Sequence, residues 1–303
     1  MTASPPLAGV RVLELAQGIA GPYAAKLLSD LGAEVIKVEP PTGDITRTFG
    51  PFPACAPHPE RSGLFAYLNA TKRGVVLDLS SEVDRNACLR LAEDADVVIE
   101  SFTPAEREHL GLNAPDFPDR CPSVVVVSVT PFGSWGPRAP WRGNDLIAFH
   151  SSGFAFGFPA LQVDNAALPP LNAPTYAAEF LAGQVAATAA MHGMLVVQQT
   201  GLGRHLDVSF QEAVASANNA QFNRIATPTD GGARRVFSDR PSNSVVALLP
   251  CSDGWVAISP REEHQWSRWL EVMGSPDWAE DPRFRDRALR DQNWAELYPR
   301  LAD

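Results

Sequence analysis

Short apolar runs alternate with helix-length segments over the first 130 residues, and this alternation limits the possible fold more than any other feature. Such continuous apolar runs are typical of parallel strands that helices cover on both faces. Consecutive parallel strands need a crossover connection, which is nearly always right-handed. We therefore predict an α/β fold with a doubly wound, Rossmann-like parallel sheet. The predicted strands are residues 10–15, 34–39, 75–79, 97–99 and 124–129.

The second half of the sequence predicts a long alanine-rich helix and then a smaller domain. The helix follows Pro174 and runs to about residue 199. Two apolar runs around Ser252-Asp253-Gly254 predict a hairpin. We place the large domain at residues 1–226 and a small α+β domain at residues 227–303, with 227–235 as a linker. The remaining predicted elements are a strand over 204–210, helices over 211–226 and 262–273, and hairpin strands at 245–250 and 255–259.

Composition excludes several classes of function. The formal net charge of -10 argues against a nucleic-acid surface, which needs clustered positive charge. The four cysteines form no C-x-x-C pair and the six histidines are scattered, so we expect no metal site and no disulfide. Residues 180–197 carry no formal charge, but their alanine, glycine and polar side chains favour a core helix over a membrane span. With no signal peptide expected, we predict a cytoplasmic protein.

Ligands of doubly wound sheets bind beyond the carboxyl ends of the strands. In this sequence those ends lead into residues 16–22, 40–47, 101–104 and 130–145. The first loop, with Gly18 and Gly21 before a helix, offers backbone N–H groups of the kind that bind phosphate. The G-x-G-x-x-G spacing of nicotinamide-binding domains is incomplete there, so a dehydrogenase rests on sheet topology alone.

Several segments, taken together and in order, resemble family III CoA-transferases, the superfamily of carnitine and formyl-CoA transferases and 2-methylacyl-CoA racemases. Each segment alone is common, but their order from about residue 7 to 275 is specific. The matching segments are 7–15 with Ala20-Gly21-Pro22, 31–40 with Gly43-Asp44 and Arg47, 69–73, 95–102, 132–137 and 200–213.

The resemblance implies that the large domain binds coenzyme A or an acyl-CoA as substrate, with no permanently bound cofactor. It also implies two chains interlocked as a homodimer or as a heterodimer with a related chain. The residues expected near CoA are Gln17, Gly18, Ile19, Ala20, Lys72, Arg73, Leu77, His109, Leu110 and Arg142. A solvated surface charge is the alternative for each cation.

The family nucleophile is an aspartate that begins an alanine-rich helix, with a glycine four residues later. In this chain Glu179 holds that position and Gly183 follows. The resemblance implies an acyl-CoA:carboxylate CoA-transferase that carries CoA as a thioester on Glu179. A carboxylate is a weak nucleophile that depends on its placement, and glutamate adds one methylene. A catalytically weak CoA-binding subunit that pairs with an intact copy is therefore an alternative.

Acyl-CoA racemases of the superfamily are a further alternative. They carry a histidine just before the aspartate that matches Asp145, where this chain has Asn144, which is no general base. We expect Asn144, Asp145, Phe154 and Phe156 to line the substrate pocket, with core packing as the alternative for the phenylalanines. Family members usually continue beyond the position of Asp303 into a C-terminal segment that returns to the large domain, and we expect this chain to lack it.

Overall fold

The structure, a computed structural model, describes residues 4–112, 120–157, 173, 175–218, 247–260 and 262–302. They belong to two compact units. The first combines Met1–Phe154 with Leu171–Asn223, and the second combines Ala155–Pro170 with Arg224–Asp303. The boundary predicted at residue 226 and the predicted linker fall outside the described residues, so this division stays a prediction.

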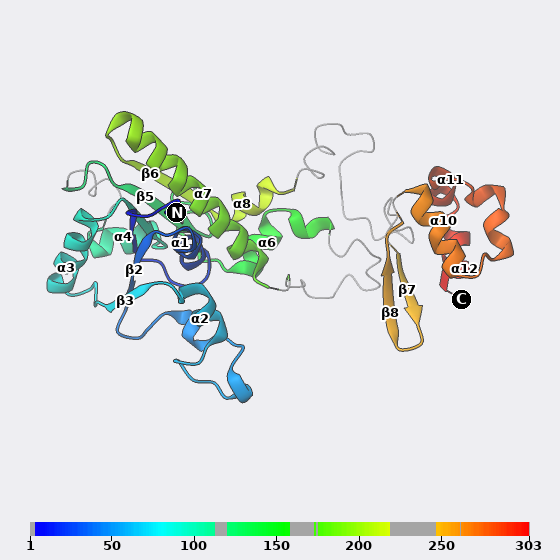
Figure 1. The fold of residues 1–303 in the computed structure, drawn as a ribbon, viewed down its shortest axis with the longest axis horizontal. Helices are drawn as coiled ribbons and strands as arrows, with labels where there is room; N and C mark the ends of the chain where they lie inside the picture. The colour runs from blue at the N-terminus through cyan, green and yellow to red at the C-terminus, as the bar shows by residue number, and fades with distance from the viewer. Residues whose placement is uncertain are drawn as a thin grey trace. The chain divides into compact units, whose positions relative to one another are not determined.

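The first unit is built on a six-stranded sheet with the strand order β3-β2-β1-β4-β5-β6 (Figure 1). Every neighbouring pair is parallel. The strand order reverses between β1 and β4, the point of such a sheet beyond whose strand ends ligands typically bind. The prediction of a doubly wound parallel sheet is confirmed. The strands are β1 Arg11–Glu14, β2 Glu34–Glu39, β3 Arg73–Val76, β4 Val97–Glu100, β5 Val125–Thr130 and β6 Arg204–Ser209.

Helices connect these strands and cover the sheet (Figure 1). The helix α1 begins at Ala20, directly after the first strand–helix loop, and α7 is the predicted alanine-rich helix. The helices are α1 Ala20–Asp30, α2 Gly63–Asn69, α3 Glu82–Glu93, α4 Pro104–Leu110, α6 Asp145–Ser151, α7 Ala177–Thr200 and α8 Phe210–Ser216. Short 3-10 helices lie at Ile45–Thr48, Pro53–Cys55 and Phe154–Gly157.

Three of the predicted elements have bounds that differ from the structure. Strand β3 begins at Arg73 rather than at residue 75, because Arg73 already pairs with Ile36 of β2. Its apolar continuation leaves the sheet, and there Leu77 and Leu79 pack on the core instead. The predicted strand over 204–210 loses its last residue to α8, which Phe210 begins after Ser209 caps the helix. The predicted helix over 211–226 ends at Ser216.

The small residues of α7 allow it to approach α1 and the sheet closely. Its buried face consists of alanine and glycine, whose side chains leave room for neighbouring backbone. A Cβ on Gly183 would lie 2.6 Å from the carbonyl oxygen of Ala20 in α1. A Cβ on Gly193 would lie 2.5 Å from Cγ1 of Val125 in β5. Glycine at these positions therefore sets how near α7 comes to the first strand–helix loop.

Helix α7 is also the one described helix that is long and apolar enough to cross a membrane, by length and composition only. In the structure it contacts α1, α6, α8, β5 and β6. Packing against a sheet and three helices is what a core helix does. The sequence interpretation of residues 180–197 as a core helix agrees with these contacts.

The second unit contains the predicted hairpin and the amphipathic helix that follows it. Strands β7 Ala247–Cys251 and β8 Gly254–Ile258 pair in antiparallel fashion. Leu249 and Trp266 are buried together with Phe284, Leu297 and Leu301. The helices are α10 Glu263–Val272, α11 Arg287–Gln292 and α12 Trp294–Ala302, with 3-10 helices at Asp277–Glu280 and Pro282–Phe284.

The contact between α1 and α7 makes a testable demand on Gly183. We expect Gly183→Ala to lower the free energy of unfolding by about 1–3 kcal/mol, because the added methyl group overlaps the Ala20 carbonyl. Urea denaturation measures the change. Gly74→Ala in β3 is the matched control, since a Cβ there meets nothing within 4 Å. Equal stability of the two variants would contradict the close approach.

Candidate active site

The loops that follow β1, β2 and β4 meet at one edge of the sheet. The hydroxyl oxygen of Ser101, after β4, accepts the backbone N–H of Gln17 at 3.1 Å. A carboxylate oxygen of Asp44, after β2, accepts the N–H of Gly18 at 3.4 Å. Gly18 has a φ of +79°, which glycine adopts without strain. The neighbouring loops therefore fix the first strand–helix loop in one conformation.

Glu179 lies against this loop, in the first turn of α7. A Cβ on Gly18 would be 3.8 Å from Oε2 of Glu179, so the carboxylate faces the glycine. The Ile19 backbone, next to Gly18, lowers the pKa of this carboxyl group and so favours its charged form. Residues 18 and 179 are far apart in sequence, and the contact of α1 with α7 brings them together. The predicted catalytic residue thus lies beside Gly18 and Ile19, two of the residues expected near CoA.

Asp145 supports Glu179 from the start of α6. Its Oδ1 accepts the backbone N–H groups of Ala178 at 2.7 Å and Glu179 at 3.1 Å. These N–H groups belong to the first turn of α7, where Tyr176 at the N-cap makes no side-chain capping bond in the described structure. The residue is only 4% exposed, and its Oδ2 has no hydrogen-bond partner among the described residues. Asp145 is therefore a capping group supplied by another helix.

The surroundings of Glu179 raise its pKa to about 7. Burial is the main cause, and the negative charge of Asp145 adds to it. The backbones of Ile19 and Asp145 act in the opposite direction because they stabilise the carboxylate. Burial also raises the pKa of Asp145. The two carboxyl groups therefore form a coupled acidic pair, and Glu179 exchanges protons near neutral pH.

Aromatic side chains surround the first turn of α7. Phe180 meets Tyr23 edge to face, with ring centroids 4.7 Å apart. Tyr176 stacks on Phe49 with a centroid distance of 6.0 Å. An apolar wall beside a carboxylate holds water away and strengthens nearby electrostatic interactions.

The predicted CoA-binding residues occupy different surroundings. Ile19 and Ala20 are buried, whereas Gln17, His109, Arg73 and Arg142 are exposed. Leu77 and Leu110 pack on one apolar cluster beneath β1, β2 and β4, so the structure brings this predicted pair together. Arg73 forms an exposed ion pair with Glu34, which contributes little stability and leaves it accessible. Their contacts with CoA stay predictions.

Lys72 differs from the other predicted cations because its side chain is buried. Its Nζ lies 2.6 Å from Oε2 of Glu14 and donates to the carbonyl oxygen of Pro22 at 2.7 Å. Burial lowers the pKa of Lys72 to about 8, although Glu14 opposes the change. These contacts already engage the ammonium group that was expected near CoA, and its burial excludes the alternative of a solvated surface charge for Lys72.

The predicted pocket residues after β5 are also partly placed. Asn144 caps α6 through its Oδ1, which accepts the N–H of Ile147 at 3.1 Å. Phe154 packs near Phe149, with ring centroids 5.5 Å apart, as core packing would have it. The side chain of Phe156 lies outside what the structure describes. Asp145 alone among the four is shown beside Glu179.

Sequence reasoning missed the capping role of Asp145 and the charged groups that hold the loop. Asp145 was expected in the substrate pocket, and its bonds to the N-terminus of α7 depend on packing between helices. The signal for the charged groups was present, since Glu14 and Lys37 are charged residues inside two apolar strands. Buried charges are normally paired, so these two residues could have been predicted to meet.

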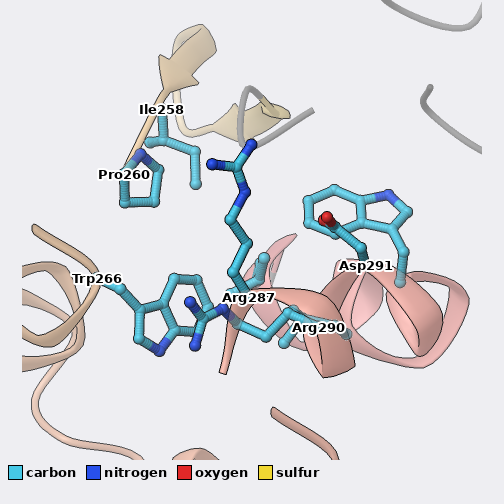
Figure 2. A pocket seen from close by; sticks show the side chains of 9 residues that line it. Ile258, Pro260, Trp266, Arg287, Arg290 and Asp291 are labelled. Carbon is cyan, nitrogen blue, oxygen red and sulfur yellow. The ribbon is translucent and has the colours of Figure 1, made fainter. Parts of the chain in front are cut away.

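A pocket in the second unit holds none of the predicted site residues (Figure 2). Trp266 and Trp294 contribute to its wall. Arg290 is neutralised there by Glu263 at 2.7 Å and lies over the ring of Trp266 at 4.3 Å. Across the described ranges of the chain, no group of three or more His, Cys, Asp or Glu side chains is arranged to hold a metal ion. The lining residues are Ile258, Pro260, Trp266, Arg287, Arg290, Asp291, Trp294, Leu297 and Leu301.

The site combines a doubly wound α/β fold with a half-buried carboxylate at a helix start, beside the glycine of the first strand–helix loop. Comparison with known proteins identifies the family. The model of CoA-transferase family III matches residues 7–303, and this chain belongs to that family.

The similar proteins carry names that agree. A probable fatty acyl-CoA transferase of Mycobacterium tuberculosis is 32% identical, over 98% of this chain and 76% of its own length. A succinyl-CoA:(R)-benzylsuccinate CoA-transferase subunit of Thauera aromatica is 36% identical, over 92% of this chain and 68% of its own. The crystal structure of a CAIB/BAIF family protein from Brucella suis superposes with a TM-score of 0.82, at 29% identity, over 99% of this chain and 78% of that one. The CoA-transferase resemblance seen in the sequence is confirmed.

The raised pKa of Glu179 predicts a pH-dependent gain in stability for Glu179→Gln. The pKa is 4.5 in the unfolded chain and about 7 when folded, so this carboxyl stabilises the fold below pH 4.5 and that contribution is lost by about pH 7. We expect the variant to melt at a higher temperature than the wild type at pH 8 and to lose this advantage at pH 4.5. Differential scanning fluorimetry at both pH values measures it. A Tm difference independent of pH would contradict the raised pKa.

Proposed function

We propose that this chain is an acyl-CoA:carboxylate CoA-transferase that carries CoA as a thioester on Glu179. The observation that supports the proposal is the carboxylate of Glu179 held against the Gly18–Ile19 backbone, in the position of the family nucleophile. The N–H of Ile19 orients one carboxylate oxygen, and the glycine leaves space above it. Placement of this kind is what a weak carboxylate nucleophile requires.

The proposed reaction proceeds by exchange of acyl and CoA groups at Glu179. A carboxylate oxygen attacks the thioester carbonyl, so that a C–O bond forms, the C–S bond breaks and CoA leaves as thiolate. The thiolate then attacks the Glu179 carbonyl of the mixed anhydride and releases the first acid as carboxylate. The acceptor carboxylate repeats these two steps in reverse and leaves as the new acyl-CoA, which regenerates the Glu179 carboxylate.

The raised pKa of Glu179 makes its carboxylate a stronger nucleophile but also limits the pH range in which the carboxylate is present. A carboxylate with a higher pKa is the stronger nucleophile, in line with Brønsted behaviour. Only the deprotonated form attacks, however, so the first step needs a pH near or above about 7. The N–H of Ile19 favours that deprotonated form and thereby offsets part of the effect of burial.

A CoA-binding subunit that works with a second, related chain is the other candidate. Two similar proteins are named as subunits, the benzylsuccinate enzyme of Thauera aromatica and a succinyl-CoA–L-malate CoA-transferase alpha subunit of Chloroflexus aurantiacus. Glutamate in place of the family aspartate suits such a division of labour. A racemase is disfavoured, since Asn144 is engaged as a helix cap and carries no basic group.

We further propose that the protein is cytoplasmic and that its chains pair as interlocked dimers, as the family resemblance implies. The exposed face of α7 supports pairing, because Met191 and Leu195 are 41% and 54% exposed there. This face carries no formal charge over four turns, with Gln184, Thr188 and His192 as its polar members. An uncharged helix face with exposed large apolar side chains is typical of an interface core.

Covalent trapping tests the proposed nucleophile. We expect intact-protein and peptide mass spectrometry, after mixing the protein with a panel of acyl-CoAs that includes succinyl-CoA, to show a CoA or acyl adduct on the peptide that contains Glu179. Glu179→Gln should abolish the adduct and the transfer, because an amide oxygen is a far weaker nucleophile, while CoA binding persists. CoA binding without any adduct would favour the partner subunit.

Glu179→Asp is the informative companion variant. Shortening the side chain withdraws the carboxylate by about one bond length, and misplacement by ~1 Å costs on the order of a hundredfold in rate. We expect a loss of that size in this chain, since the loop around Ile19 is positioned for glutamate. An unchanged rate would mean that the loop does not fix the distance of attack.

The exposed face of α7 gives a separate test of pairing. We expect the wild-type protein to have the mass of a dimer in size-exclusion chromatography with light scattering. Leu195→Glu should yield monomers, because the charge would be buried without a partner. Val83→Glu on α3 is the control, as Val83 is exposed beside the charged Glu82 and Asp84. A monomeric wild type would exclude the proposed dimer.

A further inference from the structure

Four buried charged side chains lie directly beneath the first strand–helix loop. We call them the loop quartet: Glu14, Lys37, Asp44 and Lys72. Each side chain is 2% exposed or less. Two lysines and two carboxylates give the quartet no net charge. Replacing such a group by apolar residues often costs nothing, so its presence calls for an explanation other than stability.

Glu14 links the two lysines through its two oxygens, and Asp44 joins the quartet through one oxygen. Lys37 Nζ lies 2.7 Å from Oε1 of Glu14 and 2.8 Å from Oδ2 of Asp44. Lys72 Nζ lies 2.6 Å from the other oxygen of Glu14. The register of β1 and β2 sets Glu14 beside Lys37, which fixes the centre of the quartet in the sheet.

Three members of the quartet contact the loop that faces Glu179, and the fourth, Glu14, pairs with both lysines. Lys37 donates to the carbonyl oxygen of Ala16 at 2.9 Å, where the loop begins. Lys72 donates to the carbonyl oxygen of Pro22 at 2.7 Å, in the first turn of α1. Asp44 accepts the N–H of Gly18 at 3.4 Å, between these two points. The quartet thus holds the start, the middle and the end of the loop.

We infer that the loop quartet positions the Ile19 N–H against the carboxylate of Glu179, with Asp44 as the positioning residue at the point where the loop turns. The inference rests on the proposed function for its catalytic meaning. Gly18 and Ile19 are consecutive, so Asp44 fixes the peptide unit next to the N–H that contacts Glu179. The loop quartet thereby influences both the pKa and the orientation of Glu179, which belongs to α7.

The charge of Asp44 and its positioning role predict effects of opposite sign. Removing a negative charge near Glu179 should by itself lower the pKa of Glu179. Releasing Ile19 should raise it, because the Ile19 backbone stabilises the charged form of the carboxyl. Asp44→Ala does both. We expect the release of Ile19 to prevail and to raise the pKa of Glu179 by about one unit.

The test is a carboxyl titration by NMR of the full-length protein with ¹³Cδ-labelled glutamate, in which Glu179→Gln assigns the resonance. Asp44→Asn keeps an oxygen that can accept the N–H of Gly18. In this variant the pKa of Glu179 should be no higher than in the wild type. In Asp44→Ser the serine hydroxyl still accepts the N–H of Thr46 but is too short to reach Lys37. This variant replaces Asp44→Ala if the alanine variant does not fold. Ser128→Ala is the matched control, since fully buried Ser128 hydrogen-bonds Arg107 and His205 instead of the loop.

A rise in the pKa of Glu179 in the alanine or serine variant, absent in Asp44→Asn and Ser128→Ala, supports the inference. An unchanged or lowered pKa in a folded Asp44→Ala, or an equal rise in Ser128→Ala, overturns it. Adduct formation, followed in the same proteins by mass spectrometry, separates the two proposals. If the pKa of Glu179 rises in the Asp44 variants but the wild type forms no adduct, the transferase alone is disproved. If the wild type forms adducts but the pKa does not rise in the variants, the positioning role alone is disproved.

Discussion

The close approach of α7 to α1 is the contact on which the candidate site depends. Gly183 lets α7 reach the Ala20 carbonyl, and the first turn of α7 then falls beside the loop that begins α1. Glu179 meets Gly18 and Ile19 only because the two helices are this close. A larger side chain at residue 183 would separate the carboxylate from the N–H that orients it, whatever the remaining loops did.

Two acidic groups share the environment that this contact creates, and they divide the work. One oxygen of Asp145 accepts two N–H groups in the first turn of α7, which fixes the start of the helix. Its charge and the burial of the site keep the pKa of Glu179 near neutrality. The capping group, Asp145, and Glu179 are thus coupled through electrostatics. Two neighbouring carboxyls destabilise the fold relative to one, and such perturbed pairs are typical of functional sites.

Much of the fold was predictable because local chemistry specifies it. Apolar runs marked the strands, and the turn residues Ser252-Asp253-Gly254 marked the hairpin. The strand β3 was misplaced by two residues at its start, since pairing with β2 overrides the apolar pattern at an edge. The carboxylate at residue 179 was predicted from its resemblance to a family motif. Its raised pKa, its contact with Ile19 and its cap from Asp145 were not predictable, because each depends on residues that only packing brings near.

The sequence by itself determined the parallel sheet, the order of its elements and the family, because these follow from patterns written along the chain. Only the tertiary structure decided what the charged residues do. Lys72 carries the positive charge that a phosphate ligand needs, yet its side chain is buried against Glu14 and Pro22. Asp44 was part of a motif, yet it holds the loop. A charge acts through its distance to other charges, and sequence spacing does not give that distance.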